Sequence, residues 1–245
     1  MLWALLLLIA VIVAVHAWEY ESDVREYSFA QPATMDRHDE LSRLLQEKIP
    51  IAVEVGALPW RPVIVEKAGF QIETEEGSQS PADFVKAISP VENQEELATE
   101  MELTTGLEDL NAGRPWWWLP SIRDCRVDVL STKVKPLTWT TAERTWIGCS
   151  HGGPVTVWLV HSAYRKYLGP STSSLDPWSA TVAEVPWWGR VKFVEVTVKP
   201  GWCLGVPAHW GFAARCSDEP AWIWMGEQHS LASLAISNIF KSRDE

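Results

Sequence analysis

Residues 194–213 read VEVTVKPGWCLGVPAHWGFA, and this stretch decides the fold prediction. Up to Val198, apolar β-branched residues alternate with polar ones, a pattern typical of a strand with one buried face. A Lys-Pro-Gly turn ends that strand, residues 202–206 form a second apolar run, and a third run begins at Gly211. Short strands joined by tight turns predict an antiparallel β-barrel or sandwich.

The same texture extends over most of the C-terminal half. We expect seven strands, at residues 126–130, 145–149, 155–161, 191–198, 202–206, 211–216 and 221–225. Elsewhere the residue patterns predict further elements, because their apolar positions recur with helical or strand spacing. These are a helix at residues 36–48, a half-buried strand through Ile51, Val53 and Val55, a strand at 68–73 with Phe70 and Ile72 on one face, a short acidic helix within 95–110, and a closing helix at 230–240.

Composition and charge narrow the class of protein. The chain has 245 residues, sixteen of them Trp, and a formal net charge of −11. Residues 66–114 hold twelve Asp or Glu against three Lys or Arg, so we interpret the segment from about 74 to 114 as a solvated acidic insertion. No basic stripe is present in the sequence, which argues against nucleic acid as a partner.

The N-terminus carries the clearest local signal. Residues 2–17 read LWALLLLIAVIVAVHA, sixteen residues in which only His16 is polar. One interpretation of residues 1–18 is a single-pass membrane anchor, slightly short of the roughly 20 residues that span a bilayer and extended by Trp18 and Tyr20 at the interface. The other is a signal peptide cleaved after Val15-His16-Ala17, which would leave a secreted or lumenal protein. Both address the chain to a membrane, with a linker at 19–35 and one domain at 36–245.

The four cysteines are Cys125, Cys149, Cys203 and Cys216. They are widely spaced and form no Cys-x-x-Cys pair, which excludes the usual zinc-ribbon spacing. In an oxidising compartment one or two disulfides would form, and otherwise the side chains would be small buried hydrophobes. The sequence leaves both alternatives open.

Three blocks of sequence, in the expected order, resemble the JmjC and cupin-like fold. In residues 194–213 the matching residues are those of a strand, a Pro-Gly turn and a Pro-x-x-Trp-Trp-His motif, namely Pro200, Gly201, Leu204, Val206, Pro207 and Trp210. Residues 153–159 (GPVTVWL) resemble the family's Gly-x-Lys-x-x-x-Leu strand, and residues 48–60 (KIPIAVEVGALPW) resemble its opening strand. The resemblance extends to cupin-like proteins of large algal DNA viruses and their hosts, and implies a role in a virion or a virus-related membrane. It also implies a mainly β fold, a double-stranded β-helix or jelly-roll barrel with flanking helices.

The resemblance also identifies the positions at which catalytic members bind Fe(II) and 2-oxoglutarate. In those members a His-x-Asp/Glu pair and a distal His hold the iron. The distal His position corresponds to Phe212, the His-x-Asp pair to Thr140 and Ala142, and the cosubstrate lysine to Val155. None of these side chains supplies the required ligand or charge. We therefore expect a pseudoenzyme with no metal and no cofactor, whose pocket is lined by Thr140, Ala142, Val155, Trp210 and Phe212.

Two alternatives remain at this stage. Glu143, His151 and His209 are candidates for a shifted ligand set, in which case the chain would be an Fe(II)/2-oxoglutarate-dependent oxygenase. A shift of one residue reverses the side-chain direction on a strand, which favours the pseudoenzyme.

The tryptophans at 116–118 and 187–188 either pack in the core and rim or form a contact surface for a protein partner or a sugar ring. The interpretation carried forward is a membrane-anchored, non-catalytic module with a binding or structural role.

Overall fold

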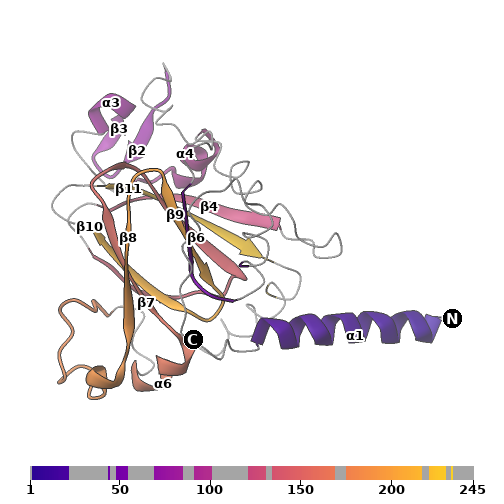
Figure 1. Ribbon diagram of the computed structural model, residues 1–245. Helices are drawn as coiled ribbons and strands as arrows, with labels where there is room; N and C mark the ends of the chain where they lie inside the picture. The colour runs from indigo at the N-terminus through magenta and orange to yellow at the C-terminus, as the bar shows by residue number, and fades with distance from the viewer. Residues whose placement is uncertain are drawn as a thin grey trace.

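The computed structural model describes residues 2–21, 44, 48–54, 69–84, 91–100, 121–130, 134–168, 175–216, 221–229 and 233. These residues form a mainly β domain with two large antiparallel sheets that face each other and a separate two-stranded sheet, preceded by one long helix (Figure 1). The antiparallel β architecture expected from the sequence is therefore confirmed.

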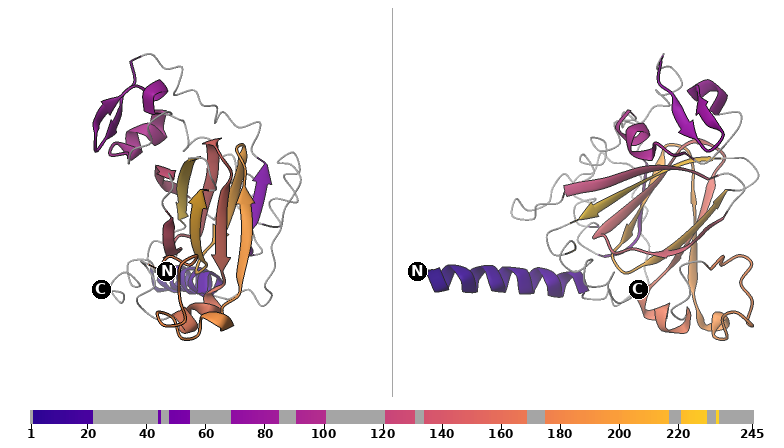
Figure 2. Two further views of the ribbon diagram at one scale, coloured as in Figure 1. Left: turned by 90° about the vertical axis from the view of Figure 1, so that its left-hand side faces the viewer. Right: turned by 180° about the vertical axis from the view of Figure 1, so that it is seen from behind.

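The two sheets contain nine strands of the described chain. The first sheet has the order β1-β9-β6-β11-β4, with the bounds β1 Ile51–Glu54, β9 Trp202–Pro207, β6 Arg144–Gly152, β11 Ala221–His229 and β4 Ser121–Leu130. The second has the order β5-β10-β7-β8, with β5 Lys135–Trp139, β10 Gly211–Cys216, β7 Val155–Val160 and β8 Phe193–Val198. Figure 2 shows the two layers from the side and from behind.

Eight of these strands form four nested antiparallel pairs. The innermost pair is β7 with β8, and around it lie β6 with β9, β5 with β10, and β4 with β11. Successive pairs alternate between the sheets, since β4, β6, β9 and β11 belong to the first and the other four to the second. The chain is thus a long folded-back ribbon wound so that each turn crosses from one layer to the other.

Apolar side chains fill the space between the layers. On β7, Val155, Val157 and Leu159 face inward at every second position, as the period of a strand requires. They pack against inward residues of the other strands, including Phe212, Leu204 and Ile223. The space between the two sheets is therefore filled by an apolar core.

The outer faces of both sheets are covered as well. On the first sheet, Trp222 packs its ring edge-on against Phe84 of α3 (Pro81–Phe84), with centroids 5.1 Å apart, and Trp146 and Trp224 are fully buried. On the second sheet, Leu137 and Val160 pack under Val185, which belongs to the segment before β8. Much of the Trp content thus serves packing.

Several predicted elements needed correction. The strand at residues 68–73 begins only at Ile72 (β2 Ile72–Thr74), and Phe70 precedes it. The expected half-buried strand at Ile51 is buried on both faces, because Ala52 faces the interior while Ile51 and Val53 are also covered. Strands β5 and β3 (Gly77–Gln79) were not predicted. The acidic helix is α4 (Gln94–Glu100) in the described part.

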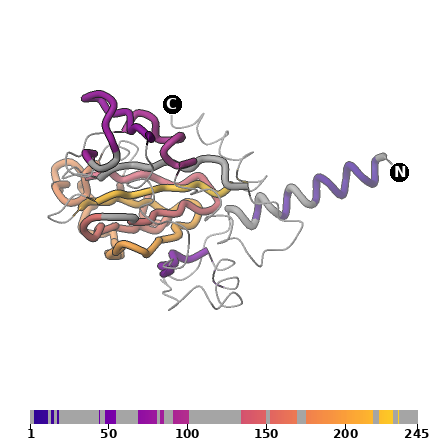
Figure 3. The backbone as a smooth tube through the Cα atoms, turned by 90° about the horizontal axis from the view of Figure 1, so that it is seen from above, coloured from indigo at the N-terminus to yellow at the C-terminus, as the bar shows by residue number. Residues whose placement is uncertain are grey.

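The predicted helices at 36–48 and 230–240 lie outside the described residues, apart from helical Leu44 and Ser233 and the turn residue Lys48. The N-terminal apolar run forms α1 (Leu2–Glu21), which extends away from the β domain (Figures 1 and 3). Those of its apolar side chains that the structure describes are exposed, Trp3 to 82%. In the part of the chain that the structure describes, no helix was found with the length and apolar character needed to cross a membrane.

Candidate functional site

The segment after β5 and the segment joining β9 to β10 lie against each other. The backbone N–H of Thr140 donates to the carbonyl of Trp210 at 2.9 Å, and the N–H of His209 donates to the carbonyl of Thr140 at 3.0 Å. The Thr140 hydroxyl donates to the carbonyl of Pro207 at 2.7 Å and also lies 3.0 Å from that of Trp210. Positions 140 and 210, expected to line one pocket, are therefore adjacent.

Phe212 is the second residue of β10. It lies opposite Thr138 of β5 and Leu159 of β7, and its ring is 2% exposed within the apolar interior. Trp210 packs its ring edge-on against His161, with centroids 4.9 Å apart. The position of the expected distal ligand is thus occupied by a phenyl ring in a packed core.

The remaining two pocket candidates are also buried. Ala142 is fully buried in the short segment before β6. Val155 faces the same interior as Phe212, but it pairs with Cys216 at the other end of β10. Val155 lies four positions along β7 from Leu159, the partner of Phe212, a distance of roughly 13 Å. The site therefore offers one hydroxyl, which is already hydrogen-bonded, and otherwise apolar groups.

The residues of the shifted ligand set do not converge. Glu143 and His209 are close, since the N–H of Ala208 donates to the carbonyl of Glu143 at 3.0 Å. His151 lies near the far end of β6, opposite Trp222, so almost the whole strand separates it from Glu143. At roughly 3.3 Å per residue that separation is on the order of 20 Å, far beyond a shared coordination sphere. The side chain of His151 itself lies outside the described atoms.

The backbone conformation at position 209 is uncommon for a residue other than glycine. His209 has a φ of 65°, the left-handed region, and it sits in the turn between β9 and β10.

Among the described residues, no three His, Cys, Asp or Glu side chains are grouped so that they could hold a metal ion.

The three cysteines whose side chains the structure describes are all buried. Cys149, Cys203 and Cys216 are buried thiols, and the side chain of Cys125 lies outside the described atoms. Burial raises the pKa of Cys203 far above its usual value near 9. Burial also raises the pKa of Cys216, partly opposed by a hydrogen bond from the backbone of Ala221. Low-pKa nucleophilic chemistry is therefore disfavoured at these two thiols.

A cavity of about 330 Å³ opens between β8 and β9 at the Val155 end of the barrel, away from Thr140 and Phe212. It is lined by Ala52, Glu195, Thr197, Lys199, Trp202 and Cys203. The cavity lies outside the position that the iron-site resemblance identifies.

The tryptophans divide into two groups. Trp188 is half-buried, with its ring 5.0 Å from that of Phe193, whereas Trp187 is 52% exposed. The guanidinium of Arg190 lies 4.6 Å from the Trp187 ring centroid. The run PWWGR already places a Pro and an Arg beside residues 187–188, whereas the exposure of Val182 was not predicted. Residues 116–118 lie outside the described chain.

Searches of protein-family models and of curated proteins find no match to this chain.

Proposed function

We propose that this protein is a membrane-attached, non-catalytic module of the cupin-like (JmjC-like) class, with a binding or structural role. The strand order supports the class. Four nested antiparallel pairs that alternate between two sheets are compatible with the connectivity expected of a double-stranded β-helix, the jelly-roll barrel of cupins.

Phe212 carries the non-catalytic part of the proposal. Under the alignment that gave the resemblance, the ring of Phe212 takes the place of the distal imidazole, and it is packed among Leu159, Leu204 and other apolar side chains. A phenyl ring has no lone pair to donate to iron, and an apolar interior does not stabilise a dicarboxylate. Thr140, at the first ligand position, uses its hydroxyl to bind a backbone carbonyl.

Helix α1 carries the attachment part. Its side chains Trp3, Leu7 and Trp18 are 82%, 69% and 73% exposed. Exposed apolar side chains such as these are unfavourable in water and favourable in lipid, at about 25 cal/mol per Å² of apolar surface removed from water. A run of sixteen residues, fifteen of them apolar, would reach well into the hydrocarbon layer as a helix.

The iron content of the purified full-length chain in detergent tests the non-catalytic proposal. We expect less than stoichiometric Fe(II) after loading under anaerobic conditions, and no turnover of 2-oxoglutarate with or without a second substrate. Phe212→His alone should behave in the same way, because Thr140 and Ala142 still lack ligand atoms.

The triple variant Thr140→His, Ala142→Asp, Phe212→His supplies ligand atoms at all three positions. Its Fe(II) content is compared with that of Phe212→His, after circular dichroism has shown that it folds. Stoichiometric Fe(II) in the unaltered chain, lost in Glu143→Ala or His209→Ala, would refute the proposal and establish the oxygenase alternative instead.

A further inference from the structure

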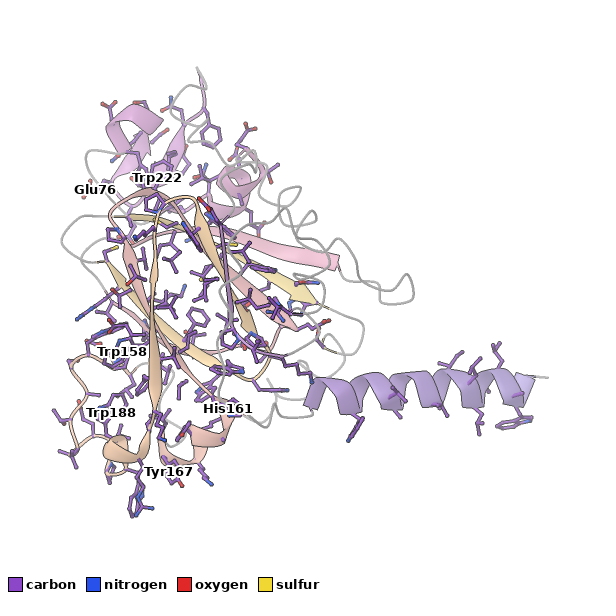
Figure 4. The ribbon with its side chains drawn as sticks, in the orientation of Figure 1. Glu76, Trp158, His161, Tyr167, Trp188 and Trp222 are labelled. Atoms are coloured by element: carbon purple, nitrogen blue, oxygen red, sulfur yellow. The ribbon has the colours of Figure 1, made fainter. Side chains whose placement is uncertain are left out.

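Exposed large apolar side chains occur in only two places in the described chain. One is α1, and the other is the loop before β8, where Val182 is 65% and Trp187 52% exposed. This loop contacts α6 (Arg165–Leu168) through the 3₁₀ turn η4 (Trp188–Arg190). We name the surface made by Arg165, Lys166, Val182, Trp187, Arg190 and Lys192 the α6–η4 surface; Figure 4 shows Trp188 and Tyr167, which mark its position at the lower end of the domain.

In the loop before β8, the exposed side chains of Val182 and Trp187 are supported by buried and hydrogen-bonded neighbours. Its inner side is anchored in the outer face of the second sheet: Val185 is buried, and Trp178 stacks on Trp158 at a centroid distance of 4.8 Å. The backbone N–H groups of Val185 and Trp188 donate to the carbonyls of Thr181 and Val185, both at 3.0 Å. Val182 and Trp187 are therefore displayed by a structured turn.

The charge of the α6–η4 surface is opposite to that of the chain. Residues 161–192 contain four Lys or Arg and two Asp or Glu, a net charge of +2 against −11 for the whole protein. All four basic side chains are exposed. Both acidic side chains accept local hydrogen bonds, Glu184 from the N–H and hydroxyl of Thr181 and Asp176 from the N–H of Trp178. The surface thus combines an exposed indole with exposed basic side chains in a segment of net positive charge.

We propose that the α6–η4 surface docks on an anionic lipid bilayer, with Trp187 and Val182 at the headgroup boundary and Arg165, Lys166, Arg190 and Lys192 among the headgroups. Indole rings favour that boundary, and each basic side chain near an anionic surface raises membrane affinity about fivefold. The inference rests on the proposed membrane attachment through α1, to which it adds a second contact that fixes the orientation of the barrel. Basic side chains around the indole favour a lipid surface over a protein partner here.

Hydrogen exchange of the full-length chain in vesicles tests this docking. The chain is incorporated into vesicles of phosphatidylcholine, with or without about 30% phosphatidylserine, and recovered by flotation. We expect the peptide covering residues 181–192 to exchange at least about threefold more slowly with phosphatidylserine present. Lys192→Glu should remove most of that difference. Lys199→Glu, the same charge change at the other end of β8, should leave it intact, and Trp187→Ser should weaken protection in both compositions.

The outcomes separate the two proposals. The chain can float with both vesicles while residues 181–192 exchange at the same rate with and without phosphatidylserine. In that case the docking is wrong and α1 attachment stands, leaving a protein partner for Trp187. Equal protection in both vesicles, or equal effects of Lys192→Glu and Lys199→Glu, overturns docking on anionic lipid. A chain that stays out of the floated fraction overturns attachment and docking together.

Discussion

The indole of Trp224 lies over the backbone of Gly148, its register partner on the neighbouring strand β6. A Cβ at position 148 would overlap the indole, and Trp224 is itself fully buried. The glycine is thus required by the close approach of a ring to a strand, and the pair fixes how β11 and β6 pack on their outer face.

Gly148→Ala should destabilise the domain by about 3 kcal/mol, because overpacking at a buried strand forces the ring or the strand to move. Chemical denaturation measures the change. Gly189→Ala, where an added Cβ meets no atom within 4 Å, should stay within about 0.5 kcal/mol of the parent. In a double-mutant cycle Gly148→Ala with Trp224→Leu should cost less than the sum of the single changes; additive costs would show that the contact is not the cause.

Thr140→Val should lower the free energy of unfolding by about 1–2 kcal/mol, because the buried Pro207 carbonyl loses its hydroxyl donor. The same substitution at Thr138, an exposed residue of β5 two positions earlier in the chain, is the matched control and should change stability by less than about 0.5 kcal/mol. Equal effects at the two positions would contradict a role for the Thr140 hydroxyl in joining β5 to the β9–β10 turn.

Phe212→Ala should cost about 3–5 kcal/mol, the range for removing a buried phenyl ring. Phe212→Leu keeps most of the apolar volume and should cost less than about 1.5 kcal/mol. Thermal and denaturant unfolding of both variants gives the comparison. A neutral Phe212→Ala would mean that the ring does not fill the interior, and the space would then be open to a ligand.

Stability should fall at alkaline pH because of Cys203. Its folded-state pKa is raised by burial above the usual value near 9, so below pH 9 the thiol is protonated in both states and its contribution is complete. Above pH 9 only the unfolded state ionises, and the free energy of unfolding decreases with a limiting slope of about 1.4 kcal/mol per pH unit. Cys203→Ala should remove that slope, whatever its cost at neutral pH; an unchanged slope between pH 9 and 10.5 would rule this origin out.

The full-length chain should fractionate with membranes and resist alkaline extraction, whereas a chain that begins at Ser28 should remain in the supernatant. Leu7→Arg with Leu8→Arg, in the middle of α1, should shift the protein toward the supernatant. Recovery of the intact chain in the soluble fraction would contradict attachment. Recovery with Trp18 as the first residue would instead establish cleavage as a signal peptide.

The strands that were predicted closely are runs of alternating or continuous apolar residues bounded by turn residues. Gly211–Cys216 was predicted with both of its ends, and β7 and β9 within one residue. Strand β5 was missed because Pro136 argues against a strand, yet β5 lies at the edge of its sheet, where a missing N–H is tolerated. The C-terminal half of β11, which contains Gly226, Glu227 and Gln228, lacks the apolar alternation and is held by pairing on both sides.

The candidate site shows the same division. The closeness of Thr140 and Trp210 was anticipated through the resemblance, because two motifs were aligned to one pocket. The separation of His151 from Glu143 was not, since it depends on the length of β6 and on an irregular register at Trp222 and Ile223 that only strand pairing determines. The Trp pair at 187–188 was recognised as either packed or part of a contact surface. Which of the two rings is exposed depends on the 3₁₀ turn, which the sequence does not reveal.

The outermost strand pair has a consequence for how the protein folds. Strands β4 and β11 join residues from Leu130 with Ala221 to Ser121 with His229, which are 91 to 108 positions apart in the chain. Contacts of such high sequence separation make loop closure costly before any pairing compensates it, and they place the domain among slow, high-contact-order folders. During synthesis the first sheet cannot be completed until residue 229 is available, whereas α1 precedes all of its strands in the chain. If α1 engages lipid early, the barrel must assemble while already tethered, which restricts encounters between partly folded chains to the membrane plane.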